Sequence, residues 1–178
     1  VSAEGTITAG MHVTKNPEFS VLPRFGVRMI LKEDMQNINY IGMGPYESYI
    51  DKHHASWHGS FSASIDEMHE DYIMPQENGS HFDCSYVQIS APGANDGADR
   101  TSHSIAMTSA VPFSMNASPY TAEELTNAAH NYELPESNKS VLCIDYRQNG
   151  IGSNSCGPRP MEKYLLSFRE PVEFTLVW

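Results

Sequence analysis

Basic side chains are scarce in this sequence. It contains 11 lysines and arginines against 22 aspartates and glutamates, which gives a formal net charge of −11 over 178 residues. Nucleic acids and anionic membrane surfaces are both bound through clusters of positive charge. We therefore expect neither a nucleic acid nor a membrane as a partner of this protein.

Cysteines and long apolar runs are also scarce. The three cysteines are Cys84, Cys143 and Cys156; they form no CxxC pair, and an odd number is a poor disulfide framework. Cys84 and Cys143 lie in apolar runs, which predicts buried thiols in a reducing compartment. No apolar run reaches the roughly 18–20 residues of a membrane span, and no charged-then-apolar leader opens the sequence. These absences favour a cytoplasmic protein.

Alternating apolar and polar residues between turn signals predict an all-β protein. The length is that of a single domain, 1–178. About eight or nine short strands are expected. Their ranges are 6–13, 25–31, 37–41, 81–90, 104–115 (one bulged strand or a pair), 139–146, 164–168 and 173–178. One short helix is expected at 121–130, because Thr121 and Glu124 form a capping box. Residues 53–74 are less regular, with Trp57 and Phe61 as expected anchors. Such a pattern is typical of an antiparallel sandwich or barrel.

The segment Gly42–Lys52 is the centre of the expected site. Gly42 and Gly44 allow a positive φ and Pro45 donates no ladder hydrogen bond, so we expect the strand at 37–41 to stop here. The loop that follows carries two aromatic rings interleaved with two carboxylates: Tyr46, Glu47, Tyr49 and Asp51. Rings of this kind lie against the C–H faces of a sugar while carboxylates bind its hydroxyl groups. The alternative is that the tyrosines pack the loop against the protein.

Carboxylates and histidines elsewhere suggest chemistry less specifically. A glycosidase needs a pair of carboxyl groups facing each other, and eight could contribute: Glu47, Asp51, Asp66, Glu67, Glu70, Asp71, Glu77 and Asp145. Sequence spacing brings no two of them together, and most are expected to be solvated surface groups. The histidines His53, His54, His58 and His69 form no His-Glu-x-x-His motif and are accompanied by no cysteine pair, so no metal is expected in this chain.

Four turn motifs stand in order along the chain. They are Leu22-Pro23-Arg24-Phe25-Gly26, Gly42-Met43-Gly44-Pro45-Tyr46-Glu47-Ser48-Tyr49-Ile50-Asp51, Pro75-Gln76-Glu77-Asn78-Gly79 and Gly150-Ile151-Gly152-Ser153-Asn154-Ser155-Cys156-Gly157-Pro158. Together, with a capped helix between the third and fourth, they resemble the C-terminal domain of glycoside hydrolase family 2 β-galactosidases, which some bacteria encode as a separate small chain. The resemblance covers residues 22–178.

This resemblance implies a large antiparallel β-sandwich related to the galactose mutarotase supersandwich, incomplete at its N-terminus. It implies that the two catalytic glutamates of retaining hydrolysis lie in a barrel domain outside this chain, which would be inactive alone. The barrel, in the same chain or in a large subunit, would be the partner, in an oligomeric holoenzyme that hydrolyses β-D-galactosides such as lactose. No cofactor is expected in this chain; Mg or Na ions would be bound elsewhere in the holoenzyme.

The resemblance also implies a substrate-pocket rim. In the family, the loop matching Gly150–Pro158 reaches over the barrel mouth, and in one branch it places a tryptophan against the sugar. The matching position here is Cys156, after a one-residue shortening, so that stacking contact is not carried over. The expected rim residues are Asn154, Ser155, Cys156, Tyr46, Glu47, Tyr49 and Asp51.

Two other functions remain open from the sequence. A free-standing carbohydrate-binding module would use Tyr46, Tyr49 and Trp57 as a stacking platform. An aldose-1-epimerase-like enzyme would need a histidine and a carboxylate in one cleft; this alternative is a fold-level analogy.

Overall fold

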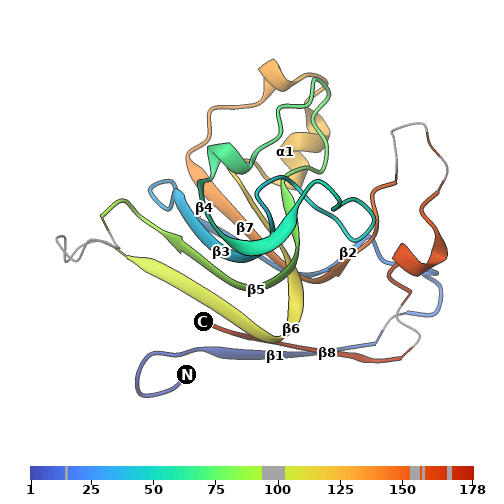
Figure 1. Ribbon diagram of the computed structural model, residues 1–178, viewed down its shortest axis with the longest axis horizontal. Helices are drawn as coiled ribbons and strands as arrows, with labels where there is room; N and C mark the ends of the chain where they lie inside the picture. Colours follow the sequence, from blue (N-terminus) through green and yellow to red (C-terminus); the bar gives the residue numbers. More distant parts are fainter. Residues whose placement is uncertain (15, 94–102, 153–156, 158, 168–169) are drawn as a thin grey trace.

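All eight strands of the described chain join one antiparallel sheet, as the computed structural model shows (Figure 1). The structure describes residues 1–14, 16–93, 103–152, 157, 159–167 and 170–178. The strands are β1 (Thr8–Val13), β2 (Arg24–Lys32), β3 (Asn37–Gly44), β4 (Trp57–Ser64), β5 (Ser80–Ser90), β6 (Ser104–Ser118), β7 (Lys139–Gln148) and β8 (Val172–Val177). The helical segments are η1 (Asp66–Met68), α1 (Ala122–Asn127), η2 (Asn131–Glu133) and η3 (Glu162–Tyr164). The all-β expectation is confirmed, and the architecture is consistent with part of a β-sandwich.

Strand β6 is the branch point of the sheet. One of its edges pairs with β5, while the other pairs first with β8, at Thr108 and Ser109, and then with β7, at 114–118. Strand β2 continues the sheet beyond β7, β3 and β4 continue it beyond β5, and β1 continues it beyond β8. In Figure 1, β1 and β8 therefore run side by side beneath the other strands, and α1 lies at the opposite end.

The core lies where side chains from these branches meet. Phe174 and Leu176 of β8 are fully buried in the same cluster as Met115 of β6 and Ile144 of β7. The period-2 patterns that predicted the strands face this cluster: in β2, Phe25, Val27, Met29 and Leu31 pack against it while the residues between them are more exposed. In β2, therefore, one alternating face contributes to the core.

The expectation that the third strand ends at Gly42 is wrong. Strand β3 runs on to Gly44 and pairs with β4 along its whole length. The glycines are needed for close approach: a Cβ on Gly42 would lie 2.4 Å from Cys84 Sγ, and one on Gly44 would meet the hydroxyl of Tyr40. Neither is among the described glycines with positive φ. The strand stops one residue later, at Pro45, which has no N–H for the ladder.

Strand β4 itself went unpredicted within the irregular segment 53–74. Its sequence is rich in glycine and serine, and it forms because the edge of β3 offers it a partner. Phe61 is an anchor as expected, with its ring centroid 5.3 Å from that of Tyr40, but Trp57 is 58% exposed. The expected range 104–115 lies within one strand, β6. In the expected range 164–168, Tyr164 ends η3 and Leu166 forms an isolated bridge with Leu22, so no strand is formed by its described residues.

The only α-helix in the described residues begins where the sequence predicts. The Thr121 side chain accepts a hydrogen bond from the Glu124 backbone N–H, and the Glu124 carboxylate accepts one from the Thr121 N–H. The helix ends at Asn127, three residues short of the expected range. None of the helices in the described part of the chain is long and apolar enough to cross a membrane.

Candidate functional site

Glu47 is the hub of the loop that follows β3. Its Oε1 accepts hydrogen bonds from Lys52 Nζ and the Tyr72 hydroxyl, each at 2.5 Å. Its Oε2 accepts from the backbone N–H of Gly79 at 3.0 Å and lies 3.5 Å from the Tyr49 hydroxyl. The carboxylate thus ties this loop to the segment that precedes β5.

These contacts fix the charge state of Glu47. Burial would raise its pKa, but the hydrogen bonds from Lys52, Tyr72 and Gly79 outweigh burial, and the pKa of Glu47 is lowered. A carboxyl group with a lowered pKa is ionised at neutral pH and is poorly suited to act as a general acid. The geometry therefore gives Glu47 the part of a structural anchor in this loop.

The three aromatic side chains near the loop differ in exposure. Tyr49 is 2% exposed, and burial raises its pKa above the ordinary value. Tyr46 and Trp57 are 60% and 58% exposed. A platform of all three rings is therefore not present at the surface, since only Tyr46 and Trp57 offer a ring face to solvent.

Asp51 joins this loop to the start of the second loop, Gly150–Pro158. Its Oδ1 accepts a hydrogen bond from the Ile151 N–H at 3.1 Å, and its Oδ2 accepts one from the Gly152 N–H at 2.9 Å. Gly150 permits this approach, because a Cβ there would lie 2.5 Å from Asp51 Oδ2. Two motifs about 100 residues apart in sequence thus meet at one point of the structure.

A cavity of about 560 Å³ opens beside this joint. Its lining includes Asp51, His53, His54 and Arg159. The His53 Nδ1 lies 2.9 Å from the carbonyl oxygen of Tyr49, and its ring stacks on that of His54 with centroids 5.1 Å apart. The cavity combines charged, polar and aromatic groups, as small-molecule sites do.

The remaining expected rim residues follow this joint in the sequence. Asn154, Ser155 and Cys156 are outside the described residues. Of the seven expected rim residues, the structure thus describes Tyr46, Glu47, Tyr49 and Asp51, and it places them on one loop. Only Tyr46 among these four is an exposed side chain, and Asp51 contacts the second loop.

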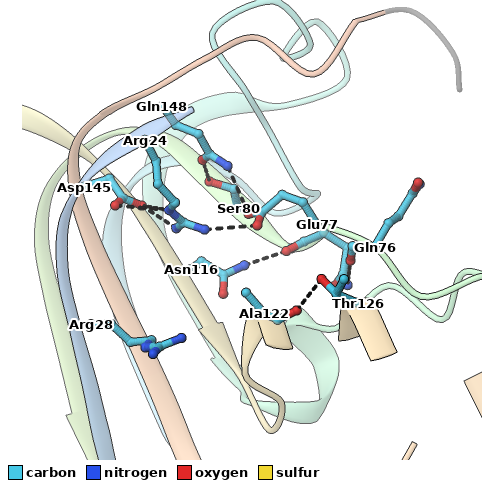
Figure 2. A network of polar contacts seen from close by, with 12 residues as sticks. Arg24, Arg28, Gln76, Glu77, Ser80, Asn116, Ala122, Thr126, Asp145 and Gln148 are labelled. Atoms are coloured by element: carbon cyan, nitrogen blue, oxygen red, sulfur yellow. Dashed lines mark hydrogen bonds and ion pairs between the residues drawn. The ribbon is translucent and has the colours of Figure 1, made fainter. Parts of the chain in front are cut away.

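Two of the eight candidate carboxylates, Glu77 and Asp145, converge on Arg24 (Figure 2). Arg24 Nη1 donates to Glu77 Oε2 at 3.0 Å, Arg24 Nε lies 3.2 Å from Asp145 Oδ2, and Arg24 Nη2 also donates to Asp145. Gln148 Nε2 donates to Glu77 Oε1 at 3.0 Å. We refer to Arg24, Glu77 and Asp145 as the arginine triad.

Electrostatics explain why the arginine triad stays together. Burial opposes the charge on Arg24, but the hydrogen bond and attraction of Asp145, with Glu77, outweigh it, and the pKa of Arg24 is raised. Burial raises the pKa of Asp145, and Arg24 opposes that rise. The two carboxylates are thus held by a cation between them, which is unlike the facing acid and nucleophile of a glycosidase.

Sequence reasoning missed the role of Arg24, although the residue stands in the first turn motif. The available signal was a cationic side chain at the entry of an apolar strand, since a buried charge requires a partner. No group of three or more His, Cys, Asp or Glu side chains that could hold a metal ion occurs among the described residues. The buried-thiol expectation holds for Cys84, whereas Cys143 is half-buried; both are free.

Comparisons with known proteins identify the family. The family model described as β-galactosidase small chain matches residues 1–178. A β-galactosidase of Actinobacillus pleuropneumoniae is 42% identical over 176 residues, which cover 98% of this chain and 16% of that protein. A β-galactosidase of Staphylococcus xylosus is 35% identical over 175 residues, 98% of this chain and 17% of that protein. The chain thus spans about a sixth of the length of these relatives, and it belongs to the β-galactosidase small chain family.

Proposed function

We propose that this chain is the C-terminal accessory portion of a glycoside hydrolase family 2 β-galactosidase. It would shape the mouth of an active site whose two catalytic glutamates lie in a barrel outside this chain. The substrates would be terminal β-D-galactosides such as lactose, hydrolysed with retention of configuration. The holoenzyme would be cytoplasmic and oligomeric, with Mg or Na ions bound outside this chain.

The joint made by Asp51 is the observation that carries this proposal. It holds the start of the Gly150–Pro158 loop, at Ile151 and Gly152, against the Gly42–Lys52 loop. A carboxylate that accepts two backbone N–H bonds is a strong anchor. Asn154, Ser155 and Cys156, which follow this joint in the sequence, are the residues of the second loop that we propose for the rim.

The arrangement of carboxylates supports placing catalysis elsewhere. Among the described residues, the converging pair Glu77 and Asp145 is bridged by Arg24, and Glu47 is occupied by hydrogen bonds. Retaining hydrolysis needs one carboxyl group free to attack the sugar and another free to donate a proton. None of these three groups is free in that sense.

Exposed apolar side chains support a contact with the rest of the enzyme. Ile73, Met74 and Tyr132 are 79%, 70% and 78% exposed. They lie on neighbouring segments, because the Asn131 N–H donates to the Ile73 carbonyl oxygen at 3.0 Å. We call Ile73, Met74 and Tyr132 the apolar corner. Large apolar side chains gathered on a surface are typical of interaction sites, and the missing five-sixths of the relatives' length would supply the partner.

The experiment that tests the proposal is hydrolysis of nitrophenyl β-galactoside by this chain alone and by this chain mixed with the catalytic portion of the enzyme. We expect no activity from the chain alone and activity after mixing. Activity of the chain alone would contradict the proposal, and so would a catalytic portion whose activity is unchanged by the chain.

The two alternatives have their own tests. A carbohydrate-binding module using the exposed rings would bind galactosides through Tyr46 and Trp57, and Trp57→Ala would abolish that binding. An epimerase would use His53 or His54 together with Asp51, because all three residues line the same cavity. Polarimetry on fresh α-galactose decides the latter, since an epimerase accelerates its mutarotation.

A further inference from the structure

A second cavity, of about 430 Å³, lies over the arginine triad. It is bounded by β2, β6 and β7, by the segment before β5 and by the first turn of α1. The triad residues Arg24, Glu77 and Asp145 line it together with Arg28 and Tyr120. Its volume falls within the roughly 300–1,000 Å³ of small-molecule sites. It shares no lining residue with the cavity beside Asp51.

Charge balance narrows the kind of ligand that fits. Arg24 is matched by Glu77 and Asp145, and Arg28 Nη1 lies 2.6 Å from Glu123 Oε2. The two cations and three carboxylates of the lining leave a single net negative charge. An anion would be repelled by that excess negative charge, and a cation would have to compete with the two arginines for the carboxylates. A neutral ligand avoids both costs.

The hydrogen-bonding groups of the lining restrict the kind of ligand further. A guanidinium group has five N–H bonds, and the contacts of Arg24 with Glu77 and Asp145 occupy Nε and one N–H on each Nη. One N–H on each Nη remains, beside carboxylate oxygens that accept hydrogen bonds. The lining thus offers both donors and acceptors close together, which matches adjacent hydroxyl groups that each donate and accept.

Part of the remaining lining is apolar and aromatic, beside amide and hydroxyl side chains. Val27 and Val141, from β2 and β7, and Leu125 of α1 contribute aliphatic surface, and Tyr120, just before α1, also lines the cavity. The Tyr120 ring is fixed edge-on against His69, with centroids 5.2 Å apart. An aromatic ring beside a polar edge suits a pyranose, which has apolar C–H faces and a rim of hydroxyl groups.

We propose that this cavity is a binding site for a neutral hexose or hexopyranoside, separate from the loop joint at Asp51. Adjacent sugar hydroxyl groups would bond Arg24 together with Glu77 or Asp145, and a C–H face would lie toward Tyr120. The site binds and does not catalyse: no histidine lines it among the described residues, and both of its inner carboxylates are paired with Arg24. The inference does not depend on the accessory role proposed above.

The proposed hexose site gives a function to two of the four sequence motifs. Arg24 belongs to the first motif and Glu77 to the third, and neither lines the cavity beside Asp51. Gln148 donates a hydrogen bond to Glu77, and Ser80 Oγ in turn donates to Gln148 Oε1 at 3.2 Å (Figure 2). Such outer partners hold a binding group in one orientation.

The test is a calorimetric titration of the complete protein with galactose and with glucose, which counts the hexose sites per chain. Ala122→Phe places a ring at the rim of the cavity from an exposed position on α1, and Glu123→Phe does so from the next position. Asn127→Phe is the matched control, because Asn127 is exposed on the same helix but does not line the cavity.

We expect each rim variant to lose one hexose site per chain, and the Asn127→Phe control to keep it. Melting curves establish that all three variants fold, and two separate rim variants guard against failure of one. An unchanged number of hexose sites in a folded rim variant would overturn the inference, and so would a parent protein without saturable hexose binding beyond any site in the barrel.

Discussion

At the scale of single residues, buried charge is matched by close partners. Glu47 has a side chain 8% exposed, and Asp145 one 5% exposed. The Glu47 carboxylate accepts hydrogen bonds from a lysine, a tyrosine and a backbone N–H, and Asp145 accepts its hydrogen bonds from Arg24. Burying an ionised carboxylate is unfavourable unless such partners are present. Stability should therefore respond sharply to the removal of one partner.

For Glu47 the expected response is a change in the pH dependence of stability. Its pKa in the folded protein is below the ordinary 4.5, so it contributes stability that is present above that value and lost as the pH falls through the folded pKa. Glu47→Gln removes the charge, and we expect a loss of about 1–3 kcal/mol at pH 7, with a smaller further loss on acidification. Urea unfolding at pH 7 and pH 4 measures both. Glu136→Gln, at an exposed position, is the control; an equal effect there would contradict the assignment.

For the arginine triad the expected response is non-additive. Arg24→Met leaves Asp145 buried without its cation, and breaking a buried pair in this way costs about 3–5 kcal/mol. The double variant Arg24→Met with Asp145→Leu removes both charges and should be more stable than Arg24→Met alone. Denaturant unfolding of the single and double variants gives the coupling free energy. Additive losses would show that the pair is not coupled.

At the scale of the elements, α1 depends on its N-cap residue. Thr121 caps a helix of only six residues, 122–127. A helix this short has little stability of its own, and removal of an N-cap side chain costs about 0.5–2 kcal/mol. We expect Thr121→Ala to lower the free energy of unfolding by that amount. Thr126→Ala, within the same helix, should change it by less; an equal change would show that the loss at Thr121 is not specific to the cap.

Strand β3 depends on a close approach at Gly42. A Cβ there would lie 2.4 Å from Cys84 Sγ and 3.0 Å from Cys84 Cα, whereas one at Gly10 of β1 would meet nothing closer than 3.8 Å. We therefore expect Gly42→Ala to lower the free energy of unfolding by about 1–3 kcal/mol and Gly10→Ala to be close to neutral. Thermal melts compare the two. Cys84→Ala should restore part of the loss, because it removes the nearest atom.

At the scale of the whole molecule, the apolar corner should matter only in the complete enzyme. Tyr132→Asp and Ile73→Asp place a charge where we propose a contact with the catalytic portion, and a charge there disrupts an apolar interface. We expect weaker association of the chain with that portion, by about tenfold or more for a loss of 1.4 kcal/mol. Sedimentation of the chain mixed with the catalytic portion measures this association. Ile30→Asp, at an exposed position of β2, is the control; equal weakening there would contradict the assignment of the interface.

The sequence by itself determined the local structure of this protein. Alternation of apolar residues, as at Val27, Met29 and Leu31, is a period-2 signal that burial later confirms. The capping box at Thr121 is equally local, because its partners are three residues apart. The motifs in order also led to the family, since four weak signals in sequence are specific together.

Only the tertiary structure decided what depends on distant partners. Strand β4 has a weak sequence signal and forms because it can pair with the edge of β3. The glycines of β3 are required by the close approach of Cys84 and Tyr40, and not by a turn. Arg24 meets residues 53 and 121 positions away, and Asp51 meets a loop about 100 positions away. The physical reason is that ion pairs and close contacts act between neighbours in space, and sequence spacing carries no information on those distances.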